Sequence, residues 1–566
     1  MAFYGRIEMK KSFLLSILLA LLALGLFSGC EGLLNQSPKT QTFFDSAKKA
    51  AGENYILVDS PSMTLGAEHA GKTAYLVKVN GGSSVQNAKD TGRLKSMARD
   101  AVLEDDFSAE LEPNENLRGL LGISGKPIEN VDIPFGAVQN ISRDSTAVFG
   151  DTIYKLGDKR KFFVAIAEKT REQRTATLKA IGSHCLIWYV PSQKSFIHES
   201  EMDFSKLAKK FDSAYDIETA IFGLNEATVD YSDVISVRSK DKVNFIVYDI
   251  FSDAEESLKK SGVFGFFTPL DLVASDSAKT SNRSQLLNID SWLFQNNPEL
   301  IYSTAVHEFQ HLLNFVQKNM NTEIGSGMSV WFQEMLSTLS EEILGGTIGT
   351  TLDDSAYIRL PWFATGGFYG FGSYSWNYFA EHDFSGTFDY GNTYTFGTYL
   401  MHNYGGIPLI HEIATNSEYE EKAISEALKT LGYTEENGRY EDFSTVLCKF
   451  GQIVANADGA AKNINTLNKS IAKDSNYNIL VNKLDLSKVK KDSFSSYKQL
   501  VRNGIIPAQE ETQNKDFPYI LYAKDRVILL PYGISVHYLG KIGANGSSYD
   551  FELPASSDIA MFILLK

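Results

Sequence analysis

The sequence predicts an α+β protein in which a central helical unit lies between β-rich segments. Short strand-like runs dominate the first part of the chain, as in residues 73–80, and they return near the end, as in residues 560–565. Long helical patterns lie between them, and strands followed by helices are typical of α+β folds. A chain of 566 residues is long enough for about three domains at ~100–200 residues each.

The composition is that of a folded globular protein. Hydrophobic residues make up 43% of the chain and charged residues 22%, which is too apolar for a disordered protein. The formal net charge of −15 argues against a nucleic-acid partner, because such a chain would not replace the counterions on a phosphate backbone. The charge places no restriction on a peptide substrate.

The first 30 residues have the pattern of a lipoprotein signal peptide. A basic stretch at residues 9–11 precedes an apolar run at residues 13–27, which is too short to span a bilayer comfortably. Residues 26–30 resemble a bacterial lipobox, although Phe27 stands where leucine is usual. We therefore expect lipidation of Cys30 and a lipid-anchored protein at the bacterial cell envelope or surface, with plain secretion as the alternative.

The rest of the chain divides into four expected parts. Residues 31–50 read as a polar linker, 51–170 as an N-terminal β domain, 171–470 as the catalytic unit and 471–566 as a C-terminal β domain. Helical patterns in the central unit cover residues 204–215, 298–319, 329–344, 392–404 and 418–431.

Cysteine use excludes a cysteine-based metal site. After Cys30 only Cys185 and Cys448 remain, and a structural zinc site of that type needs several closely spaced ligands. The two residues could form one disulfide in an exported protein or remain as two buried free thiols, and the sequence leaves both possibilities open.

The segment His307-Glu308-Phe309-Gln310-His311 carries the strongest indication of chemistry. No glycine or proline interrupts the chain from Pro298 to residue 319, so His307 and His311 fall at i and i+4 on one helical face. Two imidazoles in this arrangement can bind one zinc ion, and Glu308 beside them can act on a zinc-bound water without binding the metal. The sequence therefore predicts a zinc site with Glu308 as the catalytic base.

The alternative interpretation is a pair of surface histidines on an amphipathic helix. Apolar residues surround the motif on most sides of the helix, which predicts that the helix is buried. Buried polar groups without partners cost several kcal/mol, and a metal ion would supply the partner. Burial therefore favours the metal site.

Catalytic zinc also needs a third protein ligand. A second helix begins near Ser329, and Glu334 lies in its apolar part. Glu341 and Glu342 lie near the polar end of the same helix, and any of the three could instead be a solvated carboxylate. Since a site with two histidines and one glutamate is a common form of catalytic zinc site, we expect Glu334 to be the ligand.

The motif resembles the hyicolysin-like neutral metallopeptidases of the gluzincin group. The resemblance rests on residues 307–315 and 331–337, with further similarity at residues 262–267 and 394–406, and extends over roughly residues 180–420. It implies a gluzincin-type zinc peptidase domain between the two β domains. Gln333 and Met335 depart from the family's usual asparagine and glycine, which concerns the fit of the substrate more than metal binding.

The resemblance also implies a tyrosine that stabilises the oxyanion. In related aminopeptidases this tyrosine lies in a Tyr-x-x-Gly helix, and Tyr394 with Gly397 stands at the similar place here. A tyrosine of the hydrophobic core is the alternative, with Tyr399 and His402 as further candidates for the role.

These residues together predict hydrolysis of peptide bonds in peptides or proteins. Zinc would polarise the carbonyl and activate a water, and Glu308 would move the proton to the leaving amine. The Gly-x-Met-Glu-Asn motif that holds a free amine in related aminopeptidases is absent upstream of His307, so an endopeptidase is expected. The alternative from another class is a surface-binding lipoprotein or adhesin that uses a peptidase scaffold.

Overall fold

The computed structural model confirms that the protein combines helices and sheets. It describes residues 42–86, 88–97, 154–167, 170–223, 241–256, 263–272, 278–319, 328–350, 359, 363, 370–372, 387–434, 440–456, 460, 520–522 and 529–566. The expected signal peptide, Cys30 and most of the linker lie outside these residues. The last part of the linker segment forms helix α2 (Phe43–Ala50), whose first turn is capped by the hydroxyl of Thr42.

Strands from the two ends of the chain form one β unit. A five-stranded sheet has the order β1-β14-β3-β12-β11, and a three-stranded sheet has the order β2-β13-β4. The strands from the first part of the chain are β1 (Tyr55–Leu57), β2 (Ser62–Leu65), β3 (Thr73–Asn80) and β4 (Arg93–Met97). Those from the last part are β11 (Ile520–Tyr522), β12 (Ile534–Lys541), β13 (Ser547–Glu552) and β14 (Ile559–Leu565).

This pairing differs from the expectation of separate N-terminal and C-terminal β domains. All seven residues of β14 are buried, and the strand pairs antiparallel with β1 on one side and β3 on the other. An apolar strand of this kind is stable only between two neighbours, and here both come from the opposite end of the chain. Among the described residues, each of these two sheets therefore contains strands from both ends of the chain.

A second sheet supports the central unit. Its strand order is β5-β6-β7-β8-β10-β9, with β7, β8 and β10 parallel and β9 antiparallel at one edge. Its strands are β5 (Lys159–Ala167), β6 (Thr170–Ile181), β7 (Cys185–Tyr189), β8 (Val243–Tyr248), β9 (Gly265–Phe267) and β10 (Leu286–Asp290). Because β5 pairs with β6 along most of its length, the central unit begins before the expected boundary at residue 170.

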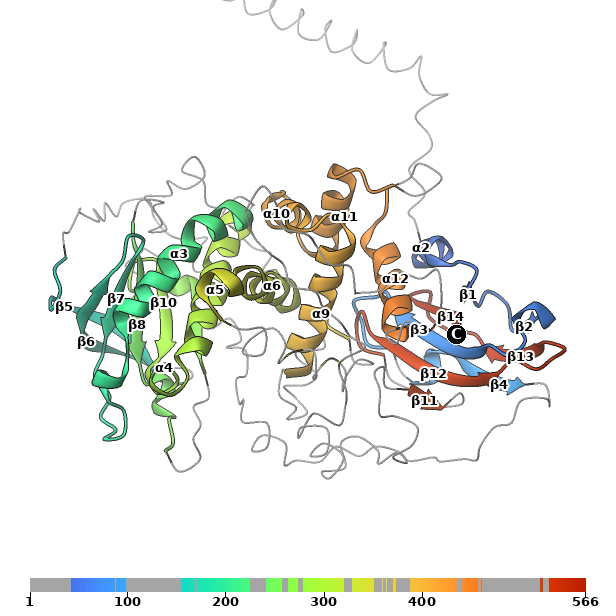
Figure 1. Cartoon of the computed structure of the whole chain (residues 1–566), viewed down its shortest axis with the longest axis horizontal. Coiled ribbons are helices and arrows are strands. Elements are labelled where there is room, and N and C mark those ends of the chain that lie inside the picture. Colours follow the sequence, from blue (N-terminus) through green and yellow to red (C-terminus); the bar gives the residue numbers. More distant parts are fainter. Residues whose placement is uncertain are drawn as a thin grey trace, which may run out of the picture.

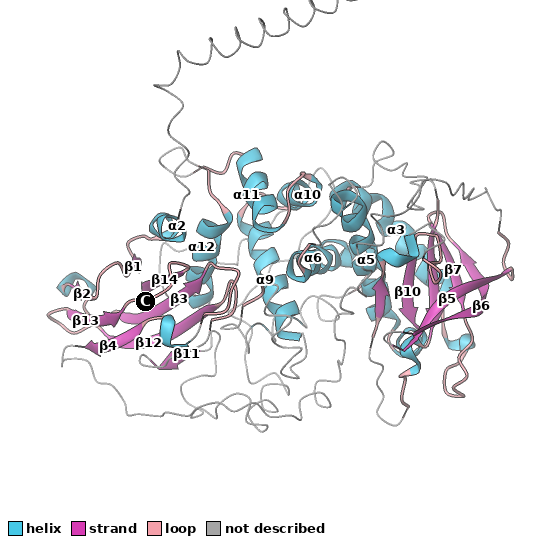
Figure 2. Ribbon diagram, turned by 180° about the vertical axis from the view of Figure 1, so that it is seen from behind, coloured by secondary structure: helices cyan, strands magenta, loops and turns pink. Residues whose placement is uncertain are grey.

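Helices fill the space between the two sheet systems (Figure 1, Figure 2). Helix α3 packs against β6, β7, α5 and α6, whereas α12 packs against β3 and α2 of the β unit. The helices are α3 (Phe204–Phe222), α4 (Ser291–Asn296), α5 (Pro298–Asn314), α6 (Val330–Ile348), α9 (Thr387–Asn403), α10 (Ile407–Thr415), α11 (Glu420–Thr430) and α12 (Phe443–Ala455). A π-helical turn, η8 (Phe315–Asn319), continues α5.

Local sequence explains where the two central helices begin and end. The side chain of Asn297 accepts a hydrogen bond from the backbone of Leu300, and Pro298 occupies the first turn of α5, where its missing N–H costs nothing. Helix α6 ends at Gly349, whose φ of +73° is a left-handed conformation that favours glycine. These signals fix the two helices that carry the predicted metal ligands.

The two cysteines in the described residues are free and buried. Burial, helped by the charge of Asp212, raises the pKa of Cys185, and burial likewise raises the pKa of Cys448. Of the two possibilities left open by the sequence, the structure therefore has free thiols. In the described part of the chain, no helix combines the length and the apolar character that crossing a lipid bilayer requires.

Candidate metal centre

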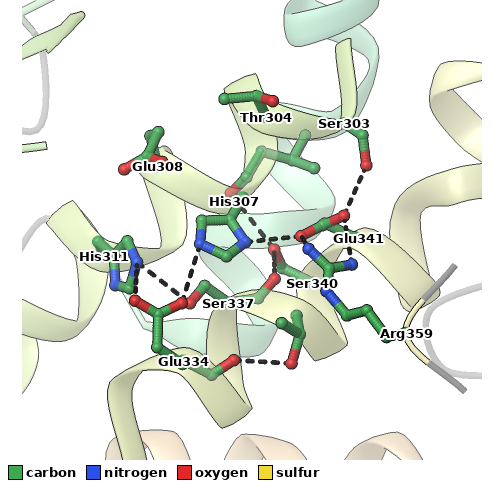
Figure 3. A network of polar contacts seen from close by, with 12 residues as sticks. Ser303, Thr304, His307, Glu308, His311, Glu334, Ser337, Ser340, Glu341 and Arg359 are labelled. Atoms are coloured by element: carbon green, nitrogen blue, oxygen red, sulfur yellow. Dashed lines mark hydrogen bonds and ion pairs between the residues drawn. The ribbon is translucent and has the colours of Figure 1, made fainter. Parts of the chain in front are cut away.

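Helices α5 and α6 bring His307, His311 and Glu334 together (Figure 3). One ligand atom from each residue can be chosen so that all three atoms lie within 4.8 Å of one another. The two histidines stand on the same face of α5, with ring centroids 4.8 Å apart. Glu334 approaches both from α6: its Oε2 lies 3.2 Å from Nε2 of His307, and its Oε1 lies 3.5 Å from Nε2 of His311.

This set of donor atoms fits a zinc ion. Two imidazole nitrogens and one carboxylate are among the common ligand sets of catalytic zinc, which leaves one position open for water. The side chains of His307 and Glu334 are only 9% and 8% exposed, so the carboxylate is poorly solvated and requires a positively charged partner. A divalent cation between the three side chains would supply it.

The charges of the site point in the same direction. Burial lowers the pKa of His307, but the carboxylates of Glu334 and Glu341 outweigh that effect and raise it to about 10. Burial raises the pKa of Glu334, but the charge of His311 and hydrogen bonds from both histidines hold it well below its usual range. The protein thus keeps a negative carboxylate beside a protonated imidazole: the carboxylate favours a bound cation, and the imidazole has to lose its proton before it can bind one.

The second ring nitrogen of His307 has its own partner. Nδ1 lies 2.6 Å from Oε1 of Glu341, which is two turns after Glu334 on α6. Both terminal nitrogens of Arg359 donate to the same carboxylate, at 2.7 and 2.9 Å, and Ser303 donates to its Oε2 at 2.9 Å. Arg359 is not part of the sequence-predicted site.

Glu308 is buried beside the ligands and connects the helix to the neighbouring sheet. Its Oε2 accepts a hydrogen bond of 2.8 Å from the backbone N–H of Phe267, on edge strand β9. Burial raises its pKa, and the positive charges of His307 and His311 partly offset that effect. A carboxylate with a raised pKa next to a metal-bound water is suited to accept a proton.

The two other glutamates of α6 do not join the ligand cluster. Glu341 contacts His307 through the ring nitrogen that faces away from Glu334, and Glu342 accepts a hydrogen bond from Tyr394. Burial raises the pKa of Glu342 to about 7, whereas Arg359 and His307 lower the pKa of the equally buried Glu341 to about 2 against the effect of burial. Of the three candidates, Glu334 is the one that lies against both histidines.

Tyr394 contacts a glutamate that lies outside the group of candidate ligands. Its side chain is fully buried, and its hydroxyl donates to Oε2 of Glu342 at 2.9 Å. Helix α9 packs on α6 with Gly397 against Met335 and Leu339, and Tyr394, three residues before Gly397, contacts Glu342, which lies about two turns beyond Glu334. The sequence pattern predicts helix α9 but does not predict how this helix is rotated about its axis.

Tyr390, one turn earlier on α9, is affected by the charges of two residues of the site. Burial raises its pKa well above its usual range, and the negative charges of Glu334 and Glu308 raise it further. Of the fallback candidates, Tyr399 donates to the backbone of Val446, and His402 is buried in the last turn of α9. Tyr390 and Tyr394 are four residues apart, so they lie near each other on one side of a helix, and this spacing is the signal in the sequence that could have suggested Tyr390 as a second candidate.

Two histidines, a glutamate from the next helix and a buried glutamate beside them are typical of the active sites of zinc metalloproteases. Consistent with this class, the chain is 28% identical over 197 residues to the protein named neutral metalloprotease ShpI of Staphylococcus hyicus. The match covers 33% of this chain and spans 41% of the length of that relative. No family model matches the chain. This distant relationship supports a metalloprotease.

Proposed function

We propose that the protein is a zinc-dependent metallopeptidase that cleaves internal peptide bonds of peptides or proteins. The observation that carries the proposal is the approach of Glu334 to Nε2 of both His307 and His311 at 3.2 and 3.5 Å. The distant similarity to a neutral metalloprotease points to the same class.

When bound, zinc would polarise the scissile carbonyl and make its bound water acidic. Glu308 would take a proton from the attacking water and pass it to the leaving amine, a role that its raised pKa and its position outside the ligand set support. The hydroxyl of Tyr390 is our candidate for stabilising the oxyanion, because Glu308 and Glu334 are among the charges that act on it.

Two features support an endopeptidase. The chain has no Gly-x-Met-Glu-Asn motif upstream of His307 that would hold a free amine. Strand β9 lies at the edge of its sheet, and its Phe267 contacts the proposed base. An extended peptide chain can pair with an edge strand along its length, which requires no free terminus.

Export and lipid anchoring through Cys30 are part of the same proposal. Their support comes from the basic residues 9–11, the apolar run at residues 13–27 and the small residues before Cys30. A peptidase at the bacterial cell envelope would meet protein substrates outside the cytoplasm.

The test combines metal analysis with digestion of an unfolded protein. The purified protein should carry about one equivalent of zinc and cleave casein, and a chelator should abolish cleavage until zinc is restored. His307→Ala should lose both zinc and activity. A chain that holds less than half an equivalent of zinc, with His307→Ala no different from it, would contradict the proposal. Adhesion to a surface without any cleavage would favour the scaffold alternative.

A further inference from the structure

The imidazole of His307 lies between two carboxylates of a single helix. Nε2 faces Glu334, at 3.2 Å, and Nδ1 faces Glu341, at 2.6 Å. The two glutamates are seven residues apart, which is close to two turns, so they lie on the same face of α6. The ring is therefore held from both sides by one rigid element (Figure 3).

The partners of Glu341 determine which nitrogen of His307 carries its hydrogen in the metal-bound form. Arg359 and Ser303 can only donate to this carboxylate at the positions that they occupy, so Glu341 is held as an anion that accepts hydrogen bonds. The neighbouring Nδ1 must then carry a hydrogen and donate it. In that tautomer the lone pair of Nε2 is free to bind a metal on the side of Glu334.

Arg359 also fixes the orientation of the carboxylate. Its two terminal nitrogens contact different oxygens of Glu341, at 2.9 and 2.7 Å, which is a bidentate arrangement. Ser303, one turn before His307 on α5, occupies a further position on Oε2. The side chain of Glu341 is only 4% exposed, so water offers little competition for these contacts.

We propose that Glu341 and Arg359 form a positioning pair that sets the tautomer and orientation of His307 and thereby strengthens metal binding. This inference rests on the proposed zinc site but adds two residues that lie outside the group of candidate metal ligands. Arg359 contacts Glu341, and Glu341 contacts the imidazole, so the pair reaches the metal position through His307. Loss of such outer partners typically weakens metal binding ~10–100-fold.

The adjacent Glu342 provides a matched control. It has the same side chain, lies on the same helix and is equally buried, but its partner is Tyr394. Glu341→Gln should weaken zinc binding ~10–100-fold, because the amide cannot accept from Arg359, Ser303 and His307 as the carboxylate does. Glu342→Gln should change zinc binding by less than about twofold, since it leaves every contact of the histidines unchanged.

The measurement is competition for zinc between the protein and a chromophoric chelator at pH 9, together with the thermal unfolding of the metal-free variants. Arg359→Met should also weaken binding, Arg359→Lys should weaken it less, and Arg359→Met should have little further effect once Glu341→Gln is present. A purely structural role would lower the unfolding temperature of the metal-free protein and leave the zinc affinity unchanged. If Glu341→Gln does not fold, the ratio of the zinc affinities of the wild type and Arg359→Lys decides whether the pair strengthens metal binding.

The two proposals can fail separately. A wild-type protein that binds no zinc refutes the proposed function and this inference with it. A wild-type protein that binds zinc, with Glu341→Gln and Arg359→Met binding it equally well, leaves the metallopeptidase intact and refutes the positioning pair.

Discussion

Zinc binding should release a proton from His307. In the metal-free site the carboxylates of Glu334 and Glu341 overcome the effect of burial and raise the pKa of this imidazole to about 10. At neutral pH its Nε2 therefore carries a hydrogen that faces Glu334, at the place where a metal would bind. Because an imidazole must be neutral at the atom that binds a metal, zinc has to displace this proton.

The cost of that displacement can be estimated from the pKa. At pH 7 the imidazole is three units below a pKa of about 10, and at about 1.36 kcal/mol per unit the proton costs ~4 kcal/mol of binding free energy. The apparent zinc affinity should therefore rise about tenfold for each pH unit between pH 6 and 9. At least one proton should leave for each zinc bound.

Calorimetry in buffers of different ionisation enthalpy measures this proton release directly. Zinc titrations at pH 7 should give heats that vary linearly with the ionisation enthalpy of the buffer, with a slope near one proton for each zinc. Chelator competition at several pH values provides the second measurement. An affinity that is constant from pH 6 to 9, with no release of protons, would show that His307 is neutral in the metal-free site and would refute this reasoning.

Four further predictions concern single side chains. Glu308→Gln should keep its zinc and its unfolding temperature but lose ~10²–10⁴ in kcat for peptide hydrolysis, and wild-type turnover would show that another group is the base. Tyr390→Phe should lower kcat ~10²–10³ with little change in KM, whereas Tyr394→Phe should leave kcat near wild type; the opposite result would restore Tyr394 to the oxyanion role. Cys30→Ser should release the protein from the membrane fraction or leave it unprocessed, and unchanged membrane association would contradict the anchor. Glu218→Leu should raise the free energy of unfolding by ~1–3 kcal/mol at pH 7.5 in urea titrations, because both oxygens of this buried carboxyl lack a hydrogen-bond partner among the described residues. The gain should be smaller near pH 4, because burial raises the pKa of this carboxyl and the wild type is less destabilised by it at low pH. A loss of stability would show that the carboxyl has a role.

The grouping of the three candidate metal ligands could be predicted because it depends on local sequence. His307 and His311 are one turn apart on an uninterrupted helix, so their convergence follows from helical geometry. Glu334 follows on the next helix, and α5 and α6 pack together as the sequence suggests. The start of α5 at Pro298 and two strands, at residues 73–80 and 243–248, also match their sequence patterns.

The residues that surround the ligands could not be predicted in the same way. The partner of Tyr394 depends on the rotation of α9 about its axis, which the sequence pattern does not determine, and in the structure this partner is Glu342. Arg359 reaches Glu341 from beyond the end of α6, and no pattern of spacing connects the two. The sequence leaves open that Glu341 is a solvated carboxylate near the polar end of its helix. In the structure it is buried, because Arg359 and His307 supply the partners that its charge requires.

Long-range pairing also explains why two β domains were expected where the described residues form one β unit. A strand pattern indicates that a segment is extended and buried on one or both faces, but it does not identify the neighbouring strand. In this protein β3 lies between β14 and β12, so its two neighbours come from more than 450 residues further along the chain. The helices that carry the candidate metal site are thus encoded between two groups of strands that, among the described residues, share one sheet. Helix α12 packs against β3 and against α11, α11 packs against α10, and α10 packs against α3 of the central unit. Because these contacts are continuous, we expect the folding of the sheet to be coupled through the helices to the unit that carries the candidate site.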